Sequence, residues 1–114
     1  MKSRDVRLYL NDIWESIIAI EEYTQTVTEE EFNKNRQLQD AVVRRLEIIG
    51  EAVKNIDEDF RNKYPEIPWK RIAGLRDIIA HEYFGVKLER IWAVVRKDIS
   101  DLKKKISRIK EEWK

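Results

Sequence analysis

The chain has 114 residues, the size of one domain that can bury a core of its own. It has no cysteine and one histidine, so it lacks disulfides and thiolate metal sites, and we expect neither a metal nor a cofactor. The formal net charge of +1 excludes a global positive field for nucleic acid. Because no apolar run reaches the roughly 20 residues of a membrane span and the start does not resemble a secretory signal, we expect a cytoplasmic protein without membrane association.

The charges are unevenly distributed along the chain. The early part is acidic, with Glu15, Glu21, Glu22, Glu29, Glu30 and Glu31. The end is basic, with Arg96, Lys97, Lys103, Lys104, Lys105, Arg108 and Lys110. A basic end attracts phosphates, but the same pattern is also typical of the solvated face of a helix.

Three glycines, two prolines and apolar residues at helical spacing predict an all-α chain. The first predicted helix follows Ser3, which we expect to be its N-cap. Its core stripe recurs at steps of three and four residues: Val6, Tyr9, Leu10, Ile13, Trp14, Ile17 and Ile20.

Thr28 and Glu31 have the spacing of a capping box, which predicts a short helical turn around Phe32. A long helix is then predicted over residues 36–56. Gly50 lies inside it, at a cost in helix propensity, which indicates close approach by a neighbouring helix.

After a short turn that Asp57 caps, Pro65 and Pro68 interrupt the chain, and the next helix is predicted to begin at Pro68 or Trp69. That helix should end by Gly85, and a last amphipathic helix should extend from about residue 86 to the C-terminus. We therefore expect one domain over residues 1–114, an up-down bundle of four main helices with short helical turns.

The segment from Arg76 to Tyr83 holds the only histidine of the chain, His81, together with Asp77. Histidine exchanges protons near neutral pH and arginine binds phosphate well, so the pair suggests metal-free chemistry on a phosphodiester. On a helix, Asp77 and His81 share a face, and Asp77 is the expected orienting partner of the imidazole. Arg76 and His81 differ by about 140°, so a shared phosphate requires either a distorted helix or two converging copies.

The single histidine favours two copies. Cleaving RNA without a metal usually needs a base for the 2′-hydroxyl and an acid for the leaving oxygen. A two-fold homodimer would supply two histidines to one cleft. The simpler interpretation is that His81 only interacts with the helix dipole and that Arg76 only pairs with a nearby carboxylate.

The pattern Arg-x-x-x-x-His-x-Tyr from Arg76 to Tyr83 resembles HEPN-domain ribonucleases, in particular the HepT-like toxins of prokaryotic toxin–antitoxin pairs. The segments 42–52 and 68–77 also resemble typical family sequence, so the resemblance covers nearly the whole chain. It implies a HEPN-like helical homodimer that cuts RNA without a metal, with tRNA or mRNA as the substrate. Arg76 and His81 would be its catalytic residues, and the products would carry a 2′,3′-cyclic phosphate.

The resemblance also implies a partner, a nucleotidyltransferase antitoxin that inhibits the toxin by binding and, in some family members, by transferring AMP to the motif tyrosine. Tyr83 stands at that position. Many family members have asparagine or another polar residue after the arginine, whereas this chain has Asp77, whose charge is expected to weaken phosphate binding. Two other functions remain open: a non-catalytic subunit that binds the nucleotidyltransferase, and a plain oligomeric helical scaffold.

Overall fold

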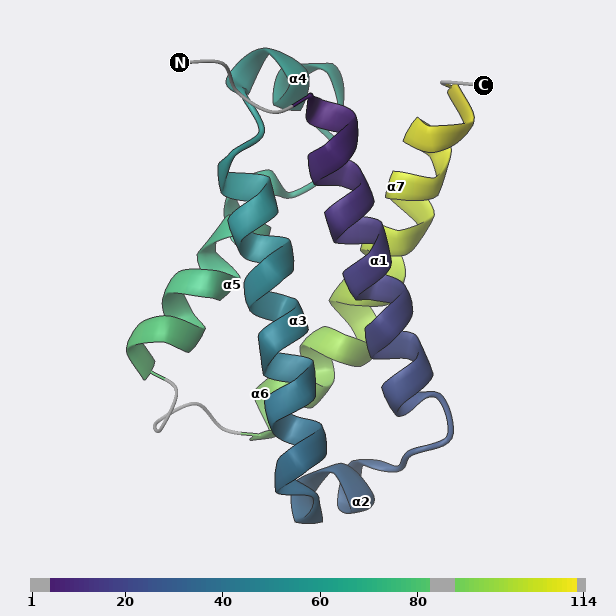
Figure 1. The fold of residues 1–114 in the computed structure, drawn as a ribbon, viewed down its shortest axis with the longest axis vertical. Helices are drawn as coiled ribbons and strands as arrows, with labels where there is room; N and C mark the ends of the chain where they lie inside the picture. The colour runs from purple at the N-terminus through teal and green to yellow at the C-terminus, as the bar shows by residue number, and fades with distance from the viewer. Residues whose placement is uncertain (1–4, 83–87, 113–114) are drawn as a thin grey trace.

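The computed structural model describes the backbone of residues 5–82 and 88–112, and the side chains of these residues except 76–82. Its helical segments are α1 (Val6–Thr24), α2 (Glu29–Lys34), α3 (Arg36–Lys54), α4 (Glu58–Lys63), α5 (Trp69–Glu82), α6 (Leu88–Ala93), η1 (Val94–Asp98) and α7 (Ile99–Glu112). The long helices alternate in direction, and α3 lies between α1 and α5 (Figure 1). The all-α, up-down bundle is therefore confirmed. Within the described ranges, none of the helices is both long and apolar enough to traverse a lipid bilayer.

The core forms where the apolar stripes of α1, α3 and α7 meet. Its fully buried side chains, each at most 1% exposed, include Leu10, Ile13, Ile17, Ile20, Val42, Leu46, Ile49, Val53, Ile106 and Ile109. Burying one such side chain stabilises the fold by about 1.5–3 kcal/mol, so these stripes are the main source of stability. The stripe predicted for the first helix is confirmed at its centre, whereas Val6, Tyr9 and Trp14 are partly buried at the edge of the core.

Short polar side chains determine where the helices begin. The prediction of Ser3 as the first N-cap is wrong, because α1 begins at Val6 and the Asp5 carboxylate accepts a hydrogen bond from the Arg7 amide at 2.9 Å. The capping box at α2 is confirmed: the Glu31 amide donates to Thr28 Oγ1 at 3.1 Å, and the Thr28 amide donates to Glu31 Oε1 at 3.0 Å. Both arrangements satisfy amides that have no partner inside the helix.

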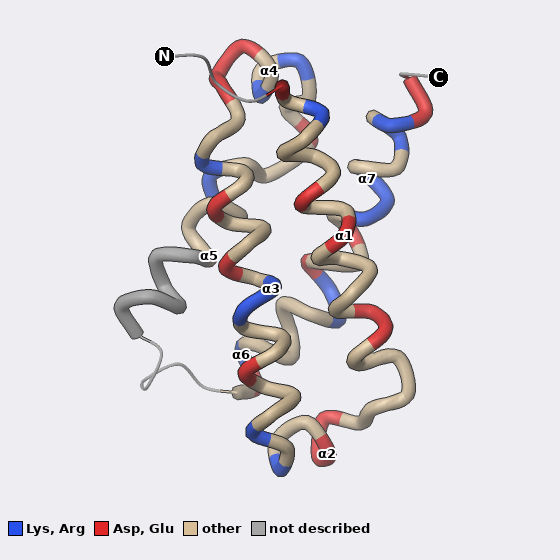
Figure 2. Tube along the Cα trace, in the orientation of Figure 1, with Lys and Arg blue, Asp and Glu red and all other residues tan. Residues whose placement is uncertain are grey.

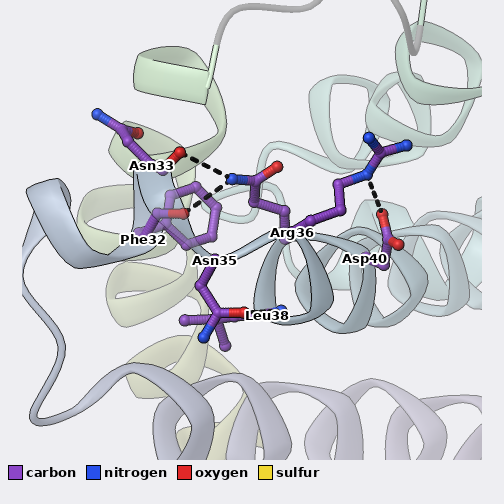
Figure 3. A network of polar contacts seen from close by, with 7 residues as sticks. Phe32, Asn33, Asn35, Arg36, Leu38 and Asp40 are labelled. Carbon is purple, nitrogen blue, oxygen red and sulfur yellow. Dashed lines mark hydrogen bonds and ion pairs between the residues drawn. The ribbon is translucent and has the colours of Figure 1, made fainter.

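A compact polar turn joins α2 to α3 (Figure 3). The Asn35 side chain caps α3 by accepting from the Leu38 amide at 3.0 Å. The Gln39 side-chain amide donates to the carbonyls of Phe32 and Asn33, at 2.9 and 3.2 Å. These bonds close the end of α2 with a side chain from α3, so the two helices form one local unit.

The last helix differs from the prediction in one respect. An uninterrupted α-helix was expected, but the five residues of η1, Val94–Asp98, are π-helical between α6 and α7. Such a segment holds one extra residue and changes the direction of the residues beyond it. From this segment, the Arg96 guanidinium donates to the carbonyls of Thr24 and Val27, at 2.9 and 2.6 Å, and lies 4.3 Å from the Trp92 ring centroid. A side chain distant in sequence thus closes the end of α1.

Candidate functional site

Three of the four residues predicted to be functional, Arg76, Asp77 and His81, occupy positions in the second half of α5. The backbone is helical from Trp69 to Glu82, so positions 76, 77 and 81 all belong to this one helix. Tyr83, the predicted modification site, lies outside the described residues. The described backbone thus confirms the helix predicted for the motif, while the chemical roles of its residues remain predictions.

Trp69 anchors the beginning of α5. Its side chain is 7% exposed, and its indole Nε1 donates to the carbonyls of Arg61 and Tyr64, at 3.1 and 3.0 Å. The ring also lies edge-on to Phe60, with 6.3 Å between centroids. Because Pro68 precedes Trp69 and restricts its own backbone, the start of α5 is held both by the chain and by the buried indole.

The segments η1 and α7 add polar contacts to the segment around the beginning of α5. Arg71 pairs with Asp98 at 2.9 Å, and the Lys105 ammonium donates to the Glu66 carbonyl at 2.8 Å. The Tyr64 hydroxyl donates to a Glu112 carboxylate oxygen at 2.8 Å, and this hydrogen bond raises the pKa of Tyr64 above its usual value. The motif-bearing half of α5 therefore extends from a firmly attached first half.

The uninterrupted course of α5 decides how the motif positions are related. The backbone is helical from residue 76 through residue 81 to Glu82, so positions 76 and 81 keep the separation of about 140° that five helical residues impose. Asp77 and His81 lie four positions apart on one face of the same helix. The helix thus carries the histidine and aspartate positions on one face and the arginine position on another side.

The basic end of the chain is largely occupied by internal contacts. Lys103 pairs with Glu21 at 2.7 Å, Lys105 pairs with Asp101 at 2.9 Å, and Lys110 lies 4.9 Å from the Trp14 ring centroid. Figure 2 shows acidic residues among the basic ones along α7. These contacts favour the interpretation of these three lysines as a solvated, ion-paired helix face rather than as a phosphate-binding patch.

The described part of the chain contains no cluster of three or more histidine, cysteine, aspartate or glutamate side chains that could hold a metal ion.

The sequence-based predictions gave no role to Gly74, which lies beside the motif. Gly74 lies within α5, three residues before Asp77 and seven before His81, and a Cβ atom built there would meet no described atom within 4 Å. The available signal was its position inside a predicted helix, where glycine costs about 1 kcal/mol relative to alanine. That argument was applied to Gly50, which is buried in α3, but it applies equally to Gly74.

Comparison with known proteins gives consistent matches over nearly the whole chain. The family model described as "Ribonuclease HepT-like" matches residues 13–109. A protein of Methanocaldococcus jannaschii named as a gamma-glutamylcyclotransferase and "putative RNase" is 56% identical over 96% of this chain, which spans only 49% of that relative. Another "putative RNase" of the same organism is 48% identical, with 96% of this chain and 90% of the relative covered. A "probable ribonuclease HepT" of Thermococcus cleftensis is 47% identical, with 90% and 94% covered. No solved structure matches the chain.

Proposed function

Because the chain belongs to the ribonuclease HepT-like family, we propose that it is a metal-independent endoribonuclease that uses Arg76 and His81. The observation that carries the mechanism is the continuous helix from Trp69 to Glu82, which separates these two positions by about 140° in a chain with one histidine. One protomer therefore offers one proton-transfer group, and its arginine position lies on a different side of the helix. A site shared by two protomers supplies what one protomer lacks.

In the proposed site, two copies of α5 meet across a two-fold axis. One His81 accepts the proton of the RNA 2′-hydroxyl, whose oxygen attacks the adjacent phosphorus. The second His81 donates a proton to the departing 5′-oxygen, so the products are a 2′,3′-cyclic phosphate and a 5′-hydroxyl. The Arg76 guanidinium binds the phosphate oxygens and stabilises the negative charge that develops on them.

Asp77 has two opposing effects in this scheme. Its carboxylate, four residues before His81, orients the imidazole and favours the protonated form that acts as the acid. The same negative charge repels the phosphodiester. Replacing Asp77 by asparagine keeps the shape and removes the charge, so we expect tighter RNA binding.

We further propose that the protein is the toxin of a toxin–antitoxin pair and that its partner is a nucleotidyltransferase. Tyr83 is the proposed acceptor of AMP. An adenylate two residues from His81 would add a bulky anion that competes with RNA for Arg76. Incubation with the nucleotidyltransferase and ATP should add AMP to the wild type but not to Tyr83→Phe, and an equal mass gain in both would rule out this acceptor.

The central test is cleavage of a mixed tRNA and mRNA pool in excess chelator by the wild type, Arg76→Ala and His81→Ala. The matched control is Arg71→Ala, which removes an arginine from the same helix outside the motif and is 70% exposed at the side chain. We expect cleavage by the wild type and the control, and loss of cleavage in both motif variants with helical circular dichroism unchanged. Cleavage that persists in His81→Ala would refute the mechanism, and no cleavage by any of the four proteins would favour the non-catalytic partner-binding subunit.

A further inference from the structure

We infer that the outer face of η1 and α7 binds the phosphate backbone of the RNA substrate, away from the cleavage site. Three exposed basic residues make this face, and we call them the outer cations: Lys97 in η1, and Lys104 and Arg108 in α7. The inference rests on the proposed ribonuclease and specifies where its substrate lies on the protein surface.

Burial separates two sets of basic residues on α7. Lys103, Lys105 and Lys110 are partly buried and have the internal contacts described above. Lys104 and Arg108 are exposed, and neither forms a hydrogen bond or a close ion pair with any residue that the structure describes. The same is true of the outer cation in η1. Because the outer cations give up no such contact within the described structure when they bind an anion, they are the ones available to phosphates.

The outer cations form one row along the helix. Residues 97, 104 and 108 are separated by seven and four positions, which is the spacing of a single helix face. The opposite side of the same stretch is buried against the core, through Val95, Ile99, Leu102 and Ile106. Lys104 and Arg108 lie one turn apart, with about 5–6 Å between their Cβ atoms. The row is about 16 Å long, and a sugar–phosphate backbone presents a matching row of negative charges.

One carboxylate lies within the row, and it is already neutralised. Asp101 stands between the first and second outer cations, and its carboxylate pairs with the Lys105 ammonium at 2.9 Å. The hydrogen bond from Lys105, together with the charges of Lys105, Lys104 and Arg108, lowers the pKa of Asp101 below its usual value. Because Lys105 is not an outer cation, the charge of Asp101 is balanced without using the row, and the outer cations keep their attraction for an anion.

The row begins beside the helix that carries the proposed catalytic positions. Asp98, the neighbour of Lys97, pairs with Arg71 of α5 at 2.9 Å. Position 76 follows position 71 by five residues, about 7.5 Å along the axis of α5. In Figure 1, α7 extends from this region away from α5. An RNA strand held at α5 therefore meets the row as it leaves, which favours RNA over an acidic protein as the occupant.

The test is the salt dependence of RNA binding, measured by fluorescence anisotropy in excess chelator. The probe is a labelled single-stranded 2′-O-methyl RNA, which lacks the 2′-hydroxyl that cleavage requires. The wild type is compared with the double variant Lys104→Gln/Arg108→Gln. The matched control is Lys103→Gln/Lys110→Gln, which removes the same charge from the same helix at partly buried positions. Circular dichroism checks that each variant keeps its helix content.

Each phosphate contact on a single strand contributes about 0.7 to the slope of log binding constant against log salt concentration. Lys104→Gln/Arg108→Gln should therefore reduce the slope by about 1.4 and raise the dissociation constant roughly tenfold or more at 0.1 M salt. Lys97→Gln alone should reduce the slope by about 0.7. The matched control should keep the slope of the wild type.

Three results would overturn the inference. The first is a slope and a dissociation constant that stay unchanged in Lys104→Gln/Arg108→Gln and in Lys97→Gln. The second is an equal loss of binding in the matched control, which would show an effect of net charge rather than of this face. The third is unchanged RNA binding with lost binding of polyglutamate, which would assign the face to an acidic protein.

These outcomes are separate from those of the proposed function. RNA binding that depends on the outer cations, in a wild type that cleaves no RNA, would support the face and reject the ribonuclease. Cleavage that depends on His81, in a protein whose RNA binding is insensitive to the outer cations, would support the ribonuclease and reject the face.

Discussion

Replacing Ser16 by alanine should stabilise the protein, although most substitutions in a core destabilise it. The Ser16 side chain is 0% exposed, and its hydroxyl has no hydrogen-bond partner in the described structure. Mutational data place the cost of burying an unpaired hydroxyl at about 1–3 kcal/mol. Alanine also has the higher helix propensity, by up to about 0.7 kcal/mol, and removing one oxygen leaves only a small void.

Together these effects should raise the free energy of unfolding by about 1–2 kcal/mol. For a chain of this size, that corresponds to a rise of roughly 4–10 °C in the midpoint of thermal unfolding. Urea unfolding followed by tryptophan fluorescence, at one fixed protein concentration, measures the change. Thr24→Val is the matched control because Thr24 is also buried, at 2% exposure, but its hydroxyl donates to the Ile20 carbonyl at 2.7 Å. In Thr24→Val, loss of this hydrogen bond should lower the free energy of unfolding by about 0.5–1.5 kcal/mol.

The two substitutions should therefore shift stability in opposite directions. A destabilised Ser16→Ala, comparable to Thr24→Val, would show that the Ser16 hydroxyl is satisfied in solution and would refute the reasoning.

Three further outcomes are expected. Arg96→Gln should lower the free energy of unfolding by about 1–3 kcal/mol, because it removes two hydrogen bonds to the end of α1 and the contact with the Trp92 ring. A urea unfolding curve identical to that of the wild type would contradict this prediction. Arg71→Ala should lower the free energy of unfolding by less than about 1 kcal/mol, because the Arg71 side chain is 70% exposed in its pair with Asp98. A larger loss in urea unfolding would show that this ion pair contributes more to stability. Hydrogen bonds from the Thr28 amide, the larger effect, and from the Thr28 hydroxyl lower the pKa of the Glu31 carboxyl. The contribution of Glu31 to stability is therefore present above the pKa of Glu31 in the unfolded chain and is lost as the pH falls through its pKa in the folded protein. Glu31→Gln should thus reduce the acid dependence of stability, and identical pH profiles for variant and wild type would argue against the capping box in solution.

The elements that could be predicted from the sequence are those that depend on neighbouring residues. The apolar stripe of α1, the capping box of Thr28 and Glu31, and the helix start at Trp69 after Pro68 all follow from interactions within a few positions of the chain. The error at Ser3 was also local, because two capping residues, Ser3 and Asp5, precede the same stripe and spacing alone did not separate them.

Contacts between distant segments could not be predicted in this way. The Arg96 guanidinium bonds the carbonyls of Thr24 and Val27, 72 and 69 positions away. Side-chain contacts over shorter separations were also not predicted, because they depend on the turn between two helices: the Arg61 guanidinium donates to the carbonyls of Ile56 and Val53 at 3.1 and 2.6 Å and closes the end of α3. A periodic pattern marks the face of a helix that becomes buried, but it does not specify which distant side chain satisfies a free carbonyl.

The same distinction holds for the candidate site. The sequence by itself determined the all-α class, the order of the helices and the placement of Arg76, Asp77 and His81 on one of them, because helical periodicity and motif spacing are properties of consecutive residues. Only the tertiary structure decided that α5 packs against α3, that Arg71 of α5 pairs with Asp98, and that a Cβ atom at position 74 would meet no described atom within 4 Å, because these contacts depend on how segments distant in sequence come together.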